Sequence, residues 1–271
     1  AICSGGRFDE VTQVVDELYD ELSVSAFRPK FCELEFSARG ALPGVAFAGE
    51  RCRGVVEGFV DRVDVWQSGG RPYVCVVDYK TGKKSFDYTN VLHGRGLQML
   101  LYLFALVRQG GHLLHGEPLP AGVLYFPARI ERVSVRDRLA QAEIEKERRK
   151  QLRRSGVLLN SDPVLEAMEP CGGSPRFLPY TLDKEGRKTG DLASFAQLAQ
   201  LERFVFRTVA ALGDELADGR IDPDPCIRDA KDSACAFCPY SEVCAGHEQP
   251  RWLKKITAEE FWQTLERREH G

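Results

Sequence analysis

Apolar residues recur along the first half of the chain at two different spacings. Residues 8–22 carry valines and leucines three and four positions apart, which predicts a helix. Alternating or continuous apolar runs then predict strands over residues 30–37, 45–47, 52–66 and 73–80. A broad apolar face predicts a second helix over residues 94–108, and a short buried strand follows over residues 123–126. The order helix, strands, helix, strand predicts a compact α/β unit in this half of the chain.

The second half of the chain is predicted to be mainly helical. We expect helices over residues 137–154, 192–216 and 258–268. Glutamates are interleaved with the basic run of residues 146–154, which indicates a solvated face rather than a nucleic-acid patch. The pattern therefore predicts an α/β core over residues 1–130 and a helical, cysteine-bearing region over residues 131–271 that packs on the core.

The composition of the 271 residues is ordinary for a globular protein, with 43% hydrophobic and 28% charged residues. The net charge of −3 argues against indiscriminate binding of polyanions, so a nucleic-acid enzyme of this charge needs a local basic groove or partner subunits. No apolar run reaches the roughly 18 residues of a membrane span and no signal-peptide pattern opens the chain, so we expect a cytoplasmic protein. The sequence starts at Ala1 within a pattern, and we expect it to be a piece of a longer protein.

Two acids and a lysine stand at the ends of neighbouring apolar runs. Asp78 and Lys80 follow the run of residues 74–77, and the strand period of two directs both side chains to the same face. Asp61 ends the preceding run. Carboxylates that hold a hard divalent cation, beside a lysine that orients or polarises water, suit metal-assisted phosphodiester cleavage. For an isolated Asp-x-Lys the alternative is a salt bridge at a strand end.

Other polar residues extend this candidate site. Gln98 and Tyr102 are four apart and therefore lie on one face of the predicted helix. Glu33 and Glu35 share one face of the first strand, so either is able to join the acidic site. Asp64 lies three residues after Asp61 and should point to the opposite face, which indicates a structural role.

Together these motifs resemble a known family. The chain carries Gly-Phe-Val-Asp-Arg-Val-Asp at residues 58–64, Val-Asp-Tyr-Lys-Thr-Gly at residues 77–82, and Gly-Leu-Gln at residues 96–98. These segments resemble the RecB-type branch of the PD-(D/E)xK nucleases, and within it the nuclease domains of AddB subunits of AddAB helicase–nucleases. Residues 156–162 are similar to the same subunits. The resemblance implies an α/β fold with a restriction-endonuclease-like core, a mixed sheet flanked by helices.

The resemblance also implies roles for individual residues. It makes Asp61 and Asp78 ligands of Mg²⁺, with the Tyr79 carbonyl as a further ligand, and gives Lys80 the positioning of the attacking water. The remaining site residues, which match the Gln-x-x-x-Tyr motif and the upstream acid of the branch, are Gln98, Tyr102 and Glu33. The implied function is a Mg²⁺-dependent DNA exonuclease that acts on single-stranded ends, with an AddA-like helicase subunit, in double-strand break processing. One departure is that no histidine precedes His93, whereas many members have one on a helix before these strands.

The C-terminal cysteines form a second candidate site. Cys235, Cys238 and Cys244 are spaced x2 and x5, which suits a [4Fe–4S] cluster with one distant ligand, or zinc if His247 completes a Cys₃His set. The spacing leaves the two cofactors open, and the resemblance favours iron–sulfur. It implies a fourth cysteine far upstream, for which Cys3 is the candidate and Cys226 the alternative. Either cofactor would have a structural role, since it would hold the C-terminal segment in place and take no part in catalysis.

Two other functions are weighed against this interpretation. A CRISPR-associated RecB-like exonuclease shares the cysteine spacing, but such enzymes are typically compact, whereas this chain has a long insert between the last core strand and the cysteines. A catalytically weak DNA-binding or assembly module with a structural metal site is the alternative from a different class.

Overall fold

The computed structural model describes residues 5–82, 85–129, 141–229, 232–236, 238–244 and 250–270. The chain divides into two compact units. Unit 1 comprises residues 1–45, 56–86 and 98–202, and unit 2 comprises residues 46–55, 87–97 and 203–271. The expected division at residue 130 falls within unit 1.

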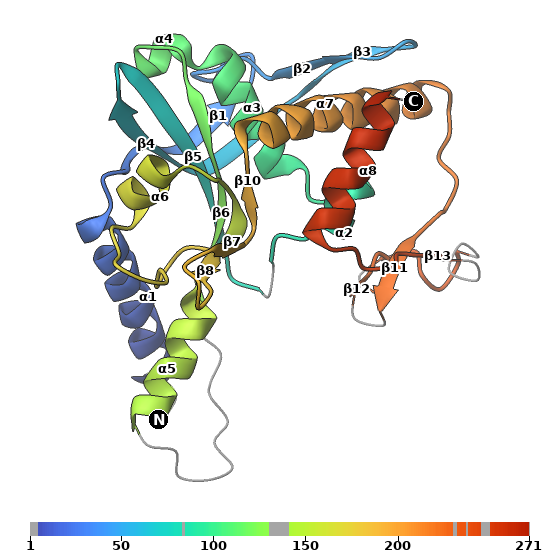
Figure 1. Cartoon of the computed structure of the whole chain (residues 1–271). Coiled ribbons are helices and arrows are strands. Elements are labelled where there is room, and N and C mark those ends of the chain that lie inside the picture. Colours follow the sequence, from blue (N-terminus) through green and yellow to red (C-terminus); the bar gives the residue numbers. More distant parts are fainter. Residues whose placement is uncertain are drawn as a thin grey trace. The chain divides into compact units, whose positions relative to one another are not determined.

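Unit 1 is built on a six-stranded mixed sheet in the order β1-β4-β5-β6-β7-β10, whose central strands lie side by side in Figure 1. Its strands are β1 (Arg28–Phe36), β4 (Gly58–Ser68), β5 (Arg71–Lys80), β6 (Leu119–Pro127), β7 (Ser155–Leu159) and β10 (Leu192–Ala193). The pairs β1·β4, β4·β5 and β6·β7 are antiparallel, whereas β5·β6 and β7·β10 are parallel. This mixed sheet confirms the predicted α/β fold class.

Unit 1 contains helices as well as this sheet. Those that begin in unit 1 are α1 (Gly5–Val24), α3 (Gln98–Gln109), α4 (Gly111–Leu114), α5 (Gln141–Leu152), α6 (Asp162–Met168) and α7 (Phe195–Ala217), and β8 (Tyr180–Leu182) and β9 (Lys188–Gly190) form a separate hairpin. The residues of α3 from Met99 to Leu106 are buried, and this helix packs against β5 and β6. Among the described helices, none combines the length and apolar character needed to cross a membrane.

Unit 2 has a small core of its own. Its elements are most of the hairpin of β2 (Val45–Ala48) and β3 (Arg53–Val56), α2 (Tyr88–Leu92), the end of α7, β11 (Cys226–Asp229), β12 (Asp232–Ser233), β13 (Arg251–Trp252) and α8 (Ala258–His270). The ring of Phe261 lies 5.0 Å from that of Tyr88 and 6.3 Å from that of Phe204, centroid to centroid. These aromatic contacts join α2 and α7 to α8.

Some predicted elements differ from the structure. The strand expected over residues 52–66 is two strands, because β3 pairs with β2 whereas β4 pairs with β1 and β5. The helix expected from residue 94 begins at Gln98, since Gly94 and Gly96 have φ angles of 74° and 68°, in the left-handed region that ends helices. The sequence analysis also missed α2, whose first turn is capped by the Asp87 carboxylate.

Helix α1 buries acids rather than the expected valines. Val11 and Val15 are 63% and 55% exposed, whereas Glu17 and Glu21 are 5% and 7% exposed. The Arg154 guanidinium lies between these two glutamates, 2.5 Å from Glu21 Oε2 and 3.6 Å from Glu17 Oε1. The expectation that residues 146–154 form a solvated face is therefore wrong at its end: the Arg154 side chain is fully buried because it neutralises two buried carboxylates.

We predict that Arg154→Ala lowers the free energy of unfolding by about 3–5 kcal/mol, because it leaves the buried Glu21 without its cation and Glu17 with Arg176 alone. Urea denaturation of the intact chain measures this change. Arg71→Ala is the matched control: Arg71 is half-exposed and lies 3.7 Å from the exposed Glu117, so its loss should cost less than about 1 kcal/mol. Equal losses for the two variants would contradict the role given to Arg154.

Candidate active site

The predicted acids lie in one row across three strands of unit 1. Strands β4 and β5 pair Arg62 with Val77, and continuing this antiparallel register places Asp61 opposite Asp78. On the other side of β4, Cys32 pairs with Arg62 and Leu34 with Val60, so Glu33 stands opposite Asp61. Like charges directly opposite one another in a sheet repel. The row is therefore stable only where cations or hydrogen-bond donors meet it.

Donors do meet the row at Asp61 and Asp78. The Tyr79 main-chain N–H donates to Asp61 Oδ2 at 2.8 Å. The Lys80 ammonium forms an ion pair with Asp78 Oδ2, an oxygen that is buried and has no hydrogen bond of good geometry. The Asp78 and Lys80 side chains are 13% and 25% exposed, so their interaction is only partly screened by water.

A small pocket of about 10 Å³ lies beside both carboxylates. Its polar lining comes from Asp61, Asp78, Gln98 and Tyr102, so four of the predicted site residues line the same pocket. A volume of this size holds about one water-sized particle. Mg²⁺ in proteins is held by one or two carboxylates and completes its coordination with water and substrate phosphates, so this pocket fits that ion.

Helix α3 places Gln98 and Tyr102 against the row. Gln98 is exposed at the first position of the helix, and Tyr102 is buried one turn later. Tyr102 stacks on Phe36 of β1 with ring centroids 5.0 Å apart. Its hydroxyl occupies the space beside Gly58, where an added Cβ would lie 2.0 Å from the oxygen. The absence of a side chain at Gly58 therefore lets Tyr102 reach the pocket.

Glu33 does not line this pocket. Its side chain is exposed, and its φ of 52° is in the left-handed region that non-glycine residues seldom adopt. Among the described residues, no three histidine, cysteine or carboxylate side chains gather closely enough to hold a metal ion, so Glu33 does not form a third acid beside Asp61 and Asp78. Glu35 accepts a hydrogen bond from the Ser37 hydroxyl at 2.7 Å.

The opposite face of the same strands carries a buried polar cluster. Arg62 donates to Asp64 Oδ2 at 2.9 Å and to the Tyr79 hydroxyl at 2.7 Å. Burial raises the pKa of Asp64 to about 6, although Arg62 opposes the shift, so Asp64 is ionised at neutral pH. The structural role expected for Asp64 agrees with this ion pair, which fixes the Tyr79 side chain on the face away from Asp61.

Tyr125 is a neighbour of the site that sequence analysis missed. It lies on β6 in register with Asp78, and its ring centroid is 5.9 Å from Lys80 Nζ. Burial, with a further contribution from Asp78, raises the pKa of Tyr125 to about 12, so its hydroxyl stays protonated at neutral pH. No sequence signal marks Tyr125, because β6 joins β5 only through the helices between them.

The cysteine site is incompletely described. Cys3 and His247 lie outside the described residues. Cys226, Cys235, Cys238 and Cys244 are half-buried and form no disulfide. Cys235 and Cys238 are joined by a turn in which the Cys238 N–H donates to the Cys235 carbonyl at 3.2 Å, and the Cys244 N–H donates to the carbonyl of Tyr240 at 3.0 Å. Thiols are the ligands that iron–sulfur clusters and zinc take, but the described cysteines do not gather closely enough in this structure to hold a metal ion.

The contact between Gly58 and Tyr102 yields a prediction. Gly58→Ala should destabilise the fold by about 1–3 kcal/mol through overpacking against the Tyr102 hydroxyl. In a Tyr102→Phe background the same change should cost less, because the nearest remaining ring atom would lie 3.2 Å from the new Cβ. A double-mutant cycle by urea denaturation measures the coupling, and additive effects would count against the contact.

Comparison with known proteins agrees with this architecture. The family model described as PD-(D/E)XK nuclease superfamily matches residues 6–245. The B subunit of an ATP-dependent helicase/deoxyribonuclease from Moorella thermoacetica is 35% identical over 237 residues, which cover 86% of this chain and 20% of that protein. Proteins of the same name from Clostridium kluyveri and Alkaliphilus oremlandii are 29% identical over 269 and 259 residues, covering 94% and 92% of the chain.

The chain spans about a fifth of the length of these relatives, 20% to 23%. The family match, by contrast, covers most of the chain and includes every described strand of the six-stranded sheet. The chain therefore belongs to the PD-(D/E)XK nuclease superfamily and has its restriction-endonuclease-like fold.

Proposed function

We propose that this chain is a Mg²⁺-dependent deoxyribonuclease domain that hydrolyses phosphodiester bonds as an exonuclease. The observation that carries the proposal is the pocket of about 10 Å³ where Asp61 and Asp78 face each other beside Lys80. Two opposed carboxylates and an ammonium suit the binding of a cation and a phosphate together, and membership of a nuclease superfamily supports the same chemistry.

Asp61 and Asp78 would hold the ion, with the Tyr79 carbonyl as a further ligand. When bound, Mg²⁺ supplies positive charge next to the phosphate that is attacked. Asp61 is oriented for this role by the hydrogen bond from the Tyr79 N–H. The Asp78 oxygen that pairs with the Lys80 ammonium would also be a ligand of the ion, which would lie beside that pair.

Lys80 would position the attacking water. Its ammonium lies beside Asp78 and close to the Tyr125 ring, on the face of the sheet that carries the pocket. From there it can donate to a water aimed at phosphorus, or to a phosphate oxygen. Gln98, at the start of α3, and the Tyr102 hydroxyl are placed to hydrogen-bond the phosphate or a water beside it. Glu33 would act on the substrate from its exposed position opposite Asp61.

We further propose that the domain works within an AddAB-type helicase–nuclease in double-strand break repair, in the cytoplasm. The relatives that share most of this chain are named as subunits of ATP-dependent helicase/deoxyribonucleases. A helicase partner would supply single-stranded ends, and it would add to the grip on DNA of a chain whose net charge is −3.

Asp78→Asn should reduce Mg²⁺-dependent degradation of single-stranded DNA by about 100-fold or more, because it removes a charge that balances the cation. EDTA should have the same effect on the unaltered chain. Glu35→Gln is the matched control: Glu35 faces Ser37 rather than the pocket, so this variant should keep its activity. Equal rates for the unaltered chain and Asp78→Asn would favour a DNA-binding module without catalysis.

We also propose a [4Fe–4S] cluster at Cys235, Cys238 and Cys244, with Cys3 as the fourth ligand and zinc as the alternative. Cys238→Ala should remove the brown colour and the bound iron and sulfide of the purified chain, whereas Cys171→Ser should not. Cys171 is a suitable control because it is exposed and its thiol contacts the Gly173 carbonyl. A colourless protein with one zinc per chain would establish the alternative.

A further inference from the structure

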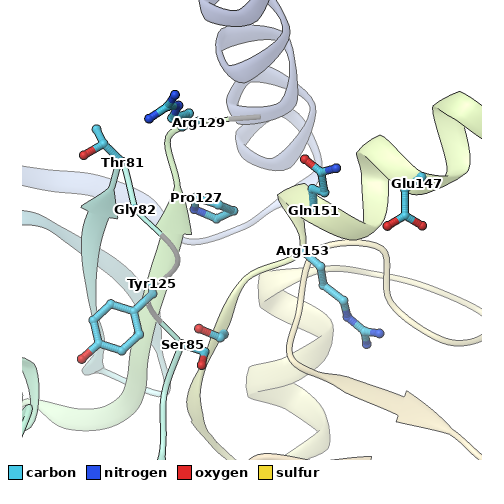
Figure 2. Close-up of a pocket in the computed structure, with 10 residues that line it drawn as sticks. Thr81, Gly82, Ser85, Tyr125, Pro127, Arg129, Glu147, Gln151 and Arg153 are labelled. Carbon is cyan, nitrogen blue, oxygen red and sulfur yellow. The ribbon is translucent and has the colours of Figure 1, made fainter. Parts of the chain in front are cut away.

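A larger pocket of about 480 Å³ adjoins the candidate active site within unit 1. It lies at the ends of β5 and β6, where Thr81 follows β5, Pro127 ends β6 and Arg129 follows it. It faces α5, which carries Glu147 and Gln151 (Figure 2). Thr81 directly follows Lys80, and Tyr125 lines this pocket while standing in register with Asp78. A molecule in the pocket would therefore be next to the acids.

The lining of this pocket offers several hydrogen-bond donors and little exposed aromatic surface on which a base could stack. Hydroxyls come from Thr81, Ser85 and Ser155, and an amide comes from Gln151. Tyr125 as a residue is only 5% exposed, so its ring offers little surface for stacking. Such a set suits the phosphate and sugar of a nucleotide better than the edge of a base.

Two arginines give the pocket its positive charge. The Arg153 side chain donates to main-chain oxygens: its Nε donates to the Leu178 carbonyl at 3.0 Å and its Nη2 to the Tyr180 carbonyl. Arg129 is exposed at the other side of the pocket. Within the described part of the chain neither guanidinium has a carboxylate partner, in contrast to the neighbouring Arg154 with its two glutamates. An anion would balance these charges.

One carboxylate in the pocket has the opposite effect. Glu147 is 47% exposed and lies 3.8 Å from Lys150. An anion in the pocket would be repelled by Glu147. Removing an arginine should therefore weaken the binding of an anion, and removing the charge of Glu147 should strengthen it.

We propose that this pocket binds the sugar–phosphate backbone of the substrate strand next to the bond that is cleaved, without reading its bases. The proposal rests on the proposed nuclease function and adds the subsite. Arg129 and Arg153 would contact phosphate, and Gln151 with the hydroxyls would contact phosphate or sugar. Hydrogen bonds to phosphate and sugar carry no sequence information, so degradation should be insensitive to sequence.

Binding of a fluorescein-labelled oligothymidylate, followed by anisotropy in EDTA so that no cleavage occurs, tests this subsite. Arg129→Ala should weaken binding about tenfold and should lower the slope of log K against log salt by about 0.7, the value for one phosphate contact on a single strand. Glu147→Gln should tighten binding. Arg71→Ala is the matched control, since Arg71 begins β5 at the end opposite Lys80 and should leave affinity unchanged.

The loss of affinity for Arg129→Ala should be the same for oligothymidylate and for an oligomer of mixed sequence. In the cleavage assay, Arg129→Ala should raise KM and leave kcat nearly unchanged. Absence of measurable binding by the unaltered chain, or affinities for Arg129→Ala and Glu147→Gln equal to that of Arg71→Ala, would overturn the subsite. If Asp78→Asn still abolished cleavage in that case, the nuclease proposal would stand without it.

Discussion

The antiparallel pairing of β4 with β5 is the constraint on which the site depends. It sets Asp61 opposite Asp78, an arrangement that electrostatic repulsion opposes. The structure offsets this repulsion locally, with the Tyr79 N–H on Asp61 and the Lys80 ammonium on Asp78. A slip of one residue in the pairing would move all of these groups to the other face. Register, rather than any single contact, therefore holds the chemistry together.

Because side chains alternate along these strands, the candidate catalytic residues lie on one face of the sheet and residues with a structural role lie on the other. The face with Asp61 and Asp78 carries the small pocket, and the other face carries the buried pair Arg62–Asp64 and the Tyr79 hydroxyl. Alternate residues of one short segment thus meet the substrate and hold the strands in place. Substitutions on the two faces should be distinguishable, because those on the second act on stability first.

The sequence was sufficient to predict those parts of the site that follow from local spacing. The strand period pairs Asp78 with Lys80 and the helix period pairs Gln98 with Tyr102. The family resemblance joined these pairs to Asp61, and Asp61, Asp78, Gln98 and Tyr102 do line one pocket. Tyr125 could not be found, since its position opposite Asp78 depends on a parallel pairing made after a crossover. The burial of Glu17 on α1 was equally hidden, because its partners Arg154 and Arg176 are more than a hundred residues away.

Those distant partners bear on the order in which unit 1 folds. Strands β4 and β5 are joined by the two-residue turn of Gly69 and Gly70, so the hairpin with the paired acids closes through local contacts. The glutamates of α1 form their ion pairs only after Arg154 and Arg176 have been brought to them. The hydrogen-bonded partners are 133 and 159 residues apart in the sequence. During synthesis the chain therefore exposes α1, with its uncompensated glutamates, until residues far downstream have left the ribosome.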